Sequence, residues 1–280
     1  YKPSSPSSKL NFDGFWEYDD APQSADHVEY KDQYNLFIDG EFVAPEKGRY
    51  FDSLNPATEE KLTSFAEATQ QDINKAVKAA RSAFNKKWST LEAKERGKYI
   101  FRLARLIQER AREFAILESM DGGKPIRESR DVDVPLAAAH FFYYAGWADK
   151  LDYAFPGKKA EPLGVAGQII PWNFPLLMLA WKVAPALATG NTVVLKPAET
   201  TSLTALKFAE LCQDAGLPDG VVNIVTGAGQ TGSAIVNHDD IDKIAFTGST
   251  EVGKIIKKSL AGTDKRYTLE LGGKGPNIIF

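Results

Sequence analysis

Residues 165–199 read VAGQIIPWNFPLLMLAWKVAPALATGNTVVLKPAE, and this stretch decides the fold. It contains a short apolar run at 165–170, an apolar run of helical length at 176–188, and a β-branched run at 192–195. Short β-branched runs favour buried strands, and a helical run between two of them is typical of a crossover helix. The stretch therefore predicts one strand–helix–strand unit of a parallel sheet.

The same alternation continues towards the C-terminus. Short apolar runs recur at 221–225 and 241–246, and helical stretches lie at 202–215 and 229–236. This alternation predicts an α/β fold, a doubly wound parallel sheet with helices on both faces. We expect this core to occupy residues 166–280.

The sequence before the core has a different pattern. Two short apolar runs at 36–43 flank Asp39-Gly40, a pair that favours a tight β-hairpin turn. A capping box at Thr69 to Asp72 then introduces apolar residues at helical spacing. Gly122-Gly123-Lys124-Pro125 ends a second helical run. This part therefore predicts a hairpin followed by helices.

The two ends of the chain lead to further expectations. Residues 1–33 are polar, and an acidic cluster there lies close to the aromatic residues Phe12, Phe15, Trp16 and Tyr18. We therefore expect a loosely packed extension that docks on its own body or on a neighbour. Because the chain does not begin with Met, we expect a fragment of a longer product. The expected divisions before the core are the extension (1–33), the hairpin and helical part (34–150) and a short arm (151–165).

Composition excludes several classes of protein. The 280 residues are 43% hydrophobic and 25% charged, as in globular proteins, and the net charge of −3 gives no reason to expect nucleic acid as a partner. The longest apolar run, 174–187, contains Pro175, Lys182 and Pro185 and is shorter than the roughly 20 residues that cross a bilayer. We therefore expect no membrane partner.

The cysteine and histidine residues give information about disulfides and metal sites. One cysteine excludes an internal disulfide, and the N-terminal stretch does not have the pattern of a signal peptide. The three histidines share no metal-ligand spacing with one another or with the cysteine. We expect a cytoplasmic protein without a metal site.

Two loops that follow predicted strands carry candidate chemistry. Asn173 lies between Pro171 and Pro175, where its amide could donate to a developing oxyanion or simply hold a rigid loop. Lys196 and Glu199 follow the next strand, where ligands bind in open α/β sheets. They could bind a ribose, or they could form a surface ion pair.

Two glycine-containing turns leave alternatives open. The segment 227–232 matches G-x-G-x-x-G, but no acidic residue follows at the usual distance, so it indicates either a tight turn into a helix or contact with a cofactor at Gly229. Phe246, Gly248 and Ser249 lead from a strand into a helix. A helix start of this kind binds phosphate, and Ser249 could equally be an ordinary N-cap.

Taken together, the motifs resemble those of the NAD(P)-dependent aldehyde dehydrogenase superfamily, in the same order and at about the same spacing, from about Phe37 onwards. The motifs that carry the resemblance are Pro171-Trp172-Asn173-Phe174-Pro175, Leu195-Lys196-Pro197-Ala198-Glu199, Phe246-Thr247-Gly248-Ser249-Thr250 and Leu269-Glu270-Leu271-Gly272-Gly273-Lys274. The resemblance implies an atypical Rossmann-like fold with NAD as cofactor.

The resemblance also implies binding roles. Lys196 and Glu199 would bind the adenosine ribose, Gly229 would approach the adenine side, and Ser249 would meet the pyrophosphate. A carboxylate at Glu199 repels a 2′-phosphate, so we expect NAD in preference to NADP, although the family includes members that use both. The cofactor-binding residues that the resemblance implies are Ile170, Pro171, Trp172, Lys196, Glu199, Gly229, Phe246, Gly248 and Ser249.

The implied reaction oxidises a small-molecule aldehyde to a carboxylate. A cysteine thiolate would attack the aldehyde, Asn173 would hold the oxyanion, and hydride transfer would leave a thioester. Glu270 would activate the water that hydrolyses it. The family's usual interface implies a homo-oligomer, weakened here by the short arm at 151–165.

The chain departs from the family pattern at the nucleophile. That cysteine belongs after the Glu270 motif, whereas Cys212 lies upstream on a helical stretch and is expected to be a packing residue. We therefore expect the chain alone to have no dehydrogenase activity. The alternative is a non-catalytic nucleotide-binding or scaffold protein of the same fold; a CoA-acylating relative is less favoured, because Glu270 suits water activation.

Overall fold

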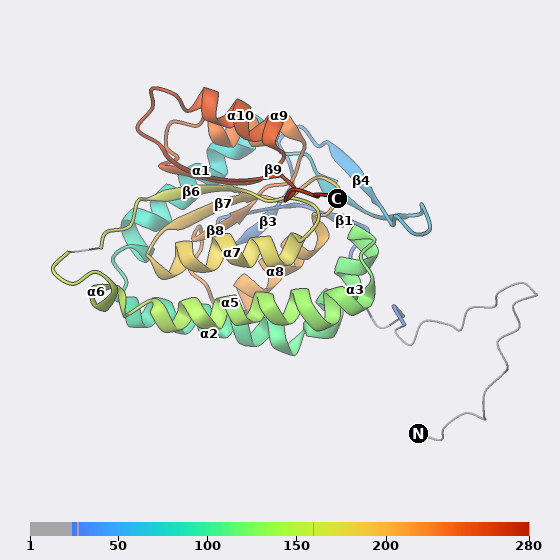
Figure 1. Cartoon of the computed structure of the whole chain (residues 1–280), viewed down its shortest axis with the longest axis horizontal. Helices are drawn as coiled ribbons and strands as arrows, with labels where there is room; N and C mark the ends of the chain where they lie inside the picture. The colour runs from blue at the N-terminus through green and yellow to red at the C-terminus, as the bar shows by residue number, and fades with distance from the viewer. Residues whose placement is uncertain (1–23, 27, 159, 280) are drawn as a thin grey trace, which may run out of the picture.

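The structure is a computed structural model that describes residues 24–26, 28–158 and 160–279. A seven-stranded sheet carries helices on both faces (Figure 1), which confirms the predicted α/β class. Phe12, Phe15, Trp16 and Tyr18 of the expected N-terminal extension lie outside the described residues.

Five strands of the main sheet are parallel, and a hairpin extends it. The order is β10-β9-β6-β7-β8-β2-β3, with β2 antiparallel to both β8 and β3. Asp39 and Gly40 form the hairpin turn with φ of 54° and 83°, as the sequence predicts. The strands are β2 (Leu36–Ile38), β3 (Glu41–Val43), β6 (Val165–Ile169), β7 (Thr192–Lys196), β8 (Val222–Ile224), β9 (Lys243–Gly248) and β10 (Arg266–Leu271).

Crossover helices divide between the two faces of the sheet (Figure 1). One face carries α7 (Pro175–Ala188) and α8 (Leu203–Asp214), and the other carries α1 (Gln70–Ala83), α9 (Gly229–Val236) and α10 (Thr250–Ser259). Each face has its own cluster of buried apolar side chains. The predicted double winding is thus confirmed.

A further layer of helices packs outside α7 and α8. Its long members are α2 (Ala93–Glu109), α3 (Ala111–Gly122) and α5 (Val134–Trp147). The second helical run is broken at Arg110, and Gly123 ends α3 in the left-handed region with φ of 69°. Short elements complete the chain: η1 (Phe84–Trp88), α4 (Ile126–Glu128), η2 (Ser129–Asp133) and α6 (Leu151–Ala154).

A second, smaller sheet was not predicted. It has the order β1-β5-β4 and is formed by β1 (Gln33–Tyr34), β4 (Tyr50–Leu54) and β5 (Lys61–Ala66). Strand β4 alternates poorly and shifts register between Ser53 and Leu54, so it lacks the apolar pattern that marks the main strands. The expected divisions at 33/34, 150/151 and 165/166 stay predictions.

Asp242 joins several elements at the amino end of the main sheet. Its Oδ2 accepts the backbone N–H of Val165 at 2.6 Å and a guanidinium N–H of Arg81, on α1, also at 2.6 Å. Its backbone N–H donates to Val165 O, and its carbonyl accepts the N–H of Arg266. A Cβ at Gly164 would come within 1.9 Å of this carboxylate, so only glycine fits there. Asp242 therefore fixes the starts of β6 and β10.

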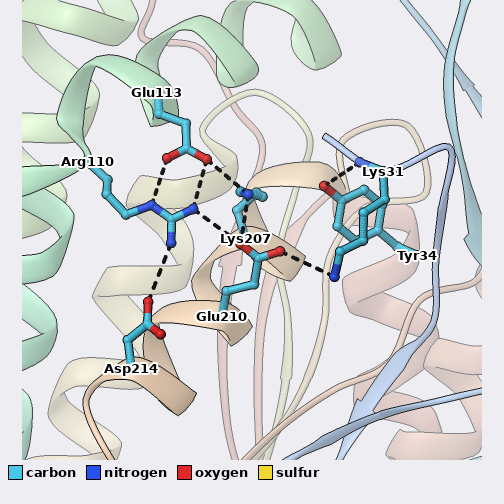
Figure 2. A network of polar contacts seen from close by, with 7 residues as sticks. All are labelled: Lys31, Tyr34, Arg110, Glu113, Lys207, Glu210 and Asp214. Atoms are coloured by element: carbon cyan, nitrogen blue, oxygen red, sulfur yellow. Dashed lines mark hydrogen bonds and ion pairs between the residues drawn. The ribbon is translucent and has the colours of Figure 1, made fainter. Parts of the chain in front are cut away.

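A polar network joins α3, α8 and the segment before β1 (Figure 2). Lys207 Nζ lies 2.7 Å from a Glu210 carboxylate oxygen and 3.0 Å from one of Glu113. Arg110 pairs with Glu113 at 2.7 Å and with Glu210 at 3.2 Å. Lys31 and Asp214 complete the network at 3.7 Å from Glu210 and Arg110, respectively.

Among the described residues, none of the helices combines the length and the apolar character that a bilayer crossing needs.

Candidate active site

The strand registers bring the candidate loops to one edge of the sheet. Ile169, near the end of β6, lies opposite Lys196 of β7 and Phe246 of β9. Glu270 of β10 lies opposite Thr247. After β8 the chain returns to the other side of β6, so β6 and β9 form the topological switch point where such sheets bind ligands.

A cleft of about 800 Å³ opens at this edge. Every residue that the sequence singles out for chemistry or cofactor binding lines it, although their roles stay predictions. They are Ile170, Pro171, Trp172, Asn173, Lys196, Glu199, Gly229, Phe246, Gly248, Ser249 and Glu270. The four loops thus converge on one space large enough for a cofactor-sized ligand.

Asn173 stands on a short loop between β6 and α7. Pro175 is the first residue of α7, where its missing N–H costs no helical hydrogen bond. Trp172 is 64% exposed, and Asn173 is also exposed. The carboxamide of Asn173 has no hydrogen-bond partner in the described part of the chain, so its N–H groups remain available to a ligand.

Lys196 is buried, which argues against the surface ion-pair interpretation. Its side chain is 5% exposed, whereas that of Glu199 is 52% exposed, and the two groups are 3.4 Å apart. The ammonium also donates to the Pro197 carbonyl at 3.0 Å. Burial lowers the pKa of Lys196, and Glu199 opposes that shift. The pair therefore offers the cleft one held cation and one exposed carboxylate.

Two helix starts line the other side of the cleft. The Ser249 hydroxyl accepts the Val252 N–H at 3.3 Å, so Ser249 is the N-cap of α10. The positive end of the α10 dipole still faces the cleft, an arrangement suited to an anionic group. Gly229 begins α9, and a Cβ there would meet no atom within 4 Å, so the space beside it is open.

Glu270 has a charged neighbour that the sequence did not single out. Lys182, on α7, is partly buried, and burial lowers its pKa to about 8, while the charge of Glu270 acts in the opposite direction. In the sequence, Lys182 only interrupts an apolar run. Further lining residues outside the motifs were also missed: Thr200, Ser233, Asn237 and Ile255.

Cys212 does not belong to the cleft. It lies on α8, is 2% exposed, and borders a separate hollow of about 520 Å³ near the β2–β3 hairpin. Burial raises the pKa of its thiol well above the ordinary range. This environment agrees with the packing role expected from the sequence.

Histidine, cysteine and acidic side chains form no metal-binding group within the described ranges.

Comparisons with known proteins give close matches over most of the chain. Human retinal dehydrogenase 2 is 52% identical over 258 residues, which are 88% of this chain and 50% of that protein. An aldehyde dehydrogenase from Alternaria alternata is 50% identical over 90% of this chain and 53% of its own length.

A solved structure of an aldehyde dehydrogenase also matches the fold of this chain. The NAD+ complex of aldehyde dehydrogenase from Bacillus cereus superposes with a TM-score of 0.84 at 48% identity, over 90% of this chain and 55% of that one. The chain spans about half the length of the relatives it matches. The family model for the aldehyde dehydrogenase family matches residues 42–280, and the chain therefore belongs to this family.

Proposed function

We propose that this chain forms the NAD-binding part of an enzyme that oxidises an aldehyde to a carboxylate. The observation that carries the proposal is the single cleft of about 800 Å³ on which all four motif loops converge. The NAD+ complex of the Bacillus cereus relative, with a TM-score of 0.84, supports the choice of cofactor. When bound, NAD would accept the hydride of the aldehyde.

The lining residues suit a dinucleotide. The buried Lys196 ammonium would donate to the adenosine ribose, and the exposed Glu199 carboxylate would accept its hydroxyl groups. Ser249 and the start of α10 would face the pyrophosphate, and the open space beside Gly229 would admit the adenine end. A 2′-phosphate would be repelled by Glu199, so we propose NAD in preference to NADP.

Two residues of the chain would act on the substrate. The unpartnered N–H groups of Asn173 would stabilise the oxyanion that forms when a thiolate attacks the aldehyde carbonyl. Glu270 would take a proton from the water that hydrolyses the thioester. Lys182 would bring a positive charge into the neighbourhood of Glu270. Because Cys212 is buried away from the cleft, the thiolate would come from outside this chain.

A non-catalytic nucleotide-binding protein is the alternative, and the position of Cys212 outside the cleft is the observation that favours it. Both functions predict NAD binding. They differ when a cysteine-bearing remainder completes the cleft: the enzyme would then form NADH from an aldehyde, and the Asn173→Ala variant would lose about 10²- to 10³-fold in kcat. We also propose a homo-oligomer.

Isothermal titration of the chain with NAD and with NADP tests the cofactor proposal. The wild type should bind NAD more tightly, Lys196→Met should weaken NAD binding, and Glu199→Gln should narrow the preference over NADP. Lys98→Met is the control, because Lys98 lies on α2 in an exposed pair with Glu95. Tighter binding of NADP by the wild type, or equal effects of Lys98→Met and Lys196→Met, would overturn the assignment.

A further inference from the structure

Glu118 reaches from α3 to the start of α7, close to the Asn173 loop. Its side chain is 2% exposed, and its Oε1 accepts the backbone N–H of Leu176 at 3.3 Å. Leu176 is the second residue of α7, and this helix has no side-chain cap of its own. Since the first N–H groups of a helix have no intrahelical partner, Glu118 supplies the acceptor that the sequence around Asn173 lacks.

Lys124 makes a second contact to the same loop. Its ammonium lies 3.9 Å from the centre of the Phe174 ring, which is a cation–π contact. The ammonium is itself held by an ion pair with the buried carboxylate of Asp133. Phe174 directly follows Asn173, so α3 and the turn after it hold the chain at two points within three residues of the amide.

The loop needs such contacts because it is not packed solidly from behind. A pocket of about 200 Å³ lies there, lined by Glu118, Lys124, Trp172 and Asn173 among others. Oε2 of Glu118 has no hydrogen-bond partner among the described residues. A loop beside open space can shift, since no close packing opposes the movement. The contacts at Phe174 and Leu176 oppose such a movement.

We propose that Glu118 and Lys124 are positioning residues that set the orientation of the Asn173 carboxamide towards the cleft. The inference rests on the proposed function, in which Asn173 donates to the oxyanion. It assigns a task to the Gly122-Gly123-Lys124-Pro125 turn beyond ending α3: the turn brings Lys124 over the Phe174 ring.

Asp121 offers a matched comparison on the same helix. It is 4% exposed, and its Oδ2 accepts the N–H of Leu203, the first residue of α8, at 2.9 Å. Its other oxygen accepts the Ser53 hydroxyl at 2.5 Å. Asp121 thus resembles Glu118 in burial and in capping a helix, but its helix does not follow Asn173.

Amide hydrogen exchange and the carboxamide NMR signal of Asn173 test the proposal on this chain. In Glu118→Leu, exchange at Leu176 should accelerate by about 10- to 100-fold relative to the α7 interior, because the buried N–H of Leu176 loses its acceptor. The Asn173 signal should move in the same variant. Glu118→Gln keeps an acceptor oxygen and should restore both to near wild-type values. Asp121→Leu should accelerate exchange at Leu203 and leave both readouts unchanged.

Phe174→Leu provides a second test that does not depend on the folding of Glu118→Leu. Phe174 is 39% exposed, so its loss removes the contact with Lys124 at little cost to the core. The Asn173 signal should move, while Leu176 stays protected. An unchanged Asn173 signal in both Glu118→Leu and Phe174→Leu, or an equal displacement in Asp121→Leu, would overturn the proposal. NAD titration of the wild type is read separately: failure to bind NAD counts against the proposed function and leaves the Asn173 readouts interpretable.

Discussion

Replacing Lys207 with methionine removes the central cation of the network in Figure 2. The Lys207 side chain is 8% exposed and contacts Glu210 and Glu113 at 2.7 and 3.0 Å. Methionine keeps most of the aliphatic volume and loses the charge. Two carboxylates would then share Arg110, with Lys31 more distant at 3.7 Å from Glu210.

The size of the effect follows from the number of contacts and their exposure. Each hydrogen bond between charged groups contributes about 1.5–3 kcal/mol. Glu113 and Glu210 are 23% and 19% exposed, and both keep a bond to Arg110, so water and Arg110 offset part of the loss. We expect Lys207→Met to lower the free energy of unfolding by about 2 kcal/mol.

Urea unfolding at pH 7 measures this difference. With a denaturant slope of about 3 kcal/mol/M for a chain of this size, the midpoint should fall by about 0.7 M. Lys98→Met is the control, because it breaks an exposed pair whose side chains are 54% and 42% exposed, and we expect a loss below about 0.5 kcal/mol. Equal midpoint shifts for the two variants would refute the reasoning.

The stabilisation by the Lys207 network should also depend on pH. Burial would raise the pKa of Glu113, but the bonds from Arg110 and Lys207 hold it below its ordinary value of 4.5. Burial would lower the pKa of Lys207, but Glu210 and Glu113 raise it above 10.5. The stabilisation is therefore present between these two values. The difference between wild type and Lys207→Met should shrink as the pH falls below 4.5 or rises above 10.5.

Other variants test separate parts of the structure. Gly167→Ala should lower the free energy of unfolding by about 1–3 kcal/mol, because the added Cβ on β6 would lie 2.7 Å from the side chain of Ile235 on α9. An unchanged midpoint of urea unfolding would contradict this. The Cys212 thiol should react with a disulfide reagent only when the chain unfolds in urea, and fast reaction of the native chain would show that it is not buried. Burial raises the pKa of Glu118 from 4.5 to about 7, so the folded state keeps a proton that the unfolded chain releases, and stability should fall as pH rises through that window. Glu118→Gln should remove this decrease of stability with pH between 4.5 and about 7. An unchanged pH dependence in that variant would show that a group other than Glu118 causes it.

The sequence predicts best what depends on neighbouring residues. The strand at 192–196 follows from a β-branched run, and the hairpin turn follows from Asp39-Gly40, which adopt positive φ. The capping box at Thr69 and Asp72 is also local, and it is present at the start of α1. The convergence of the motif loops could be expected from the parallel sheet alone, since ligands bind at the carboxyl ends of such strands.

Features that depend on distant contacts could not be predicted in this way. The hairpin joins the main sheet through the pairing of Phe37 with Ile224, and neither residue signals its partner. Lys182 lies in an apolar helical run, so only the fold shows that it faces the charge of Glu270. Glu118 likewise follows an apolar run on a helix, and only the placement of α7 shows what its carboxylate contacts.

The carboxylate of Asp242 fixes the register between neighbouring strands of the main sheet. Each residue of a strand advances by about 3.3 Å, and a slip of one position turns every side chain to the opposite face. If β6 and β9 were offset by one residue at Val165, Ile169 would no longer lie opposite Phe246. The loops that follow these two strands would then no longer be aligned with each other at the cleft. Asp242 therefore sets the register of the strands from their amino ends, and that register aligns the loops at their carboxyl ends, although Asp242 does not line the cleft.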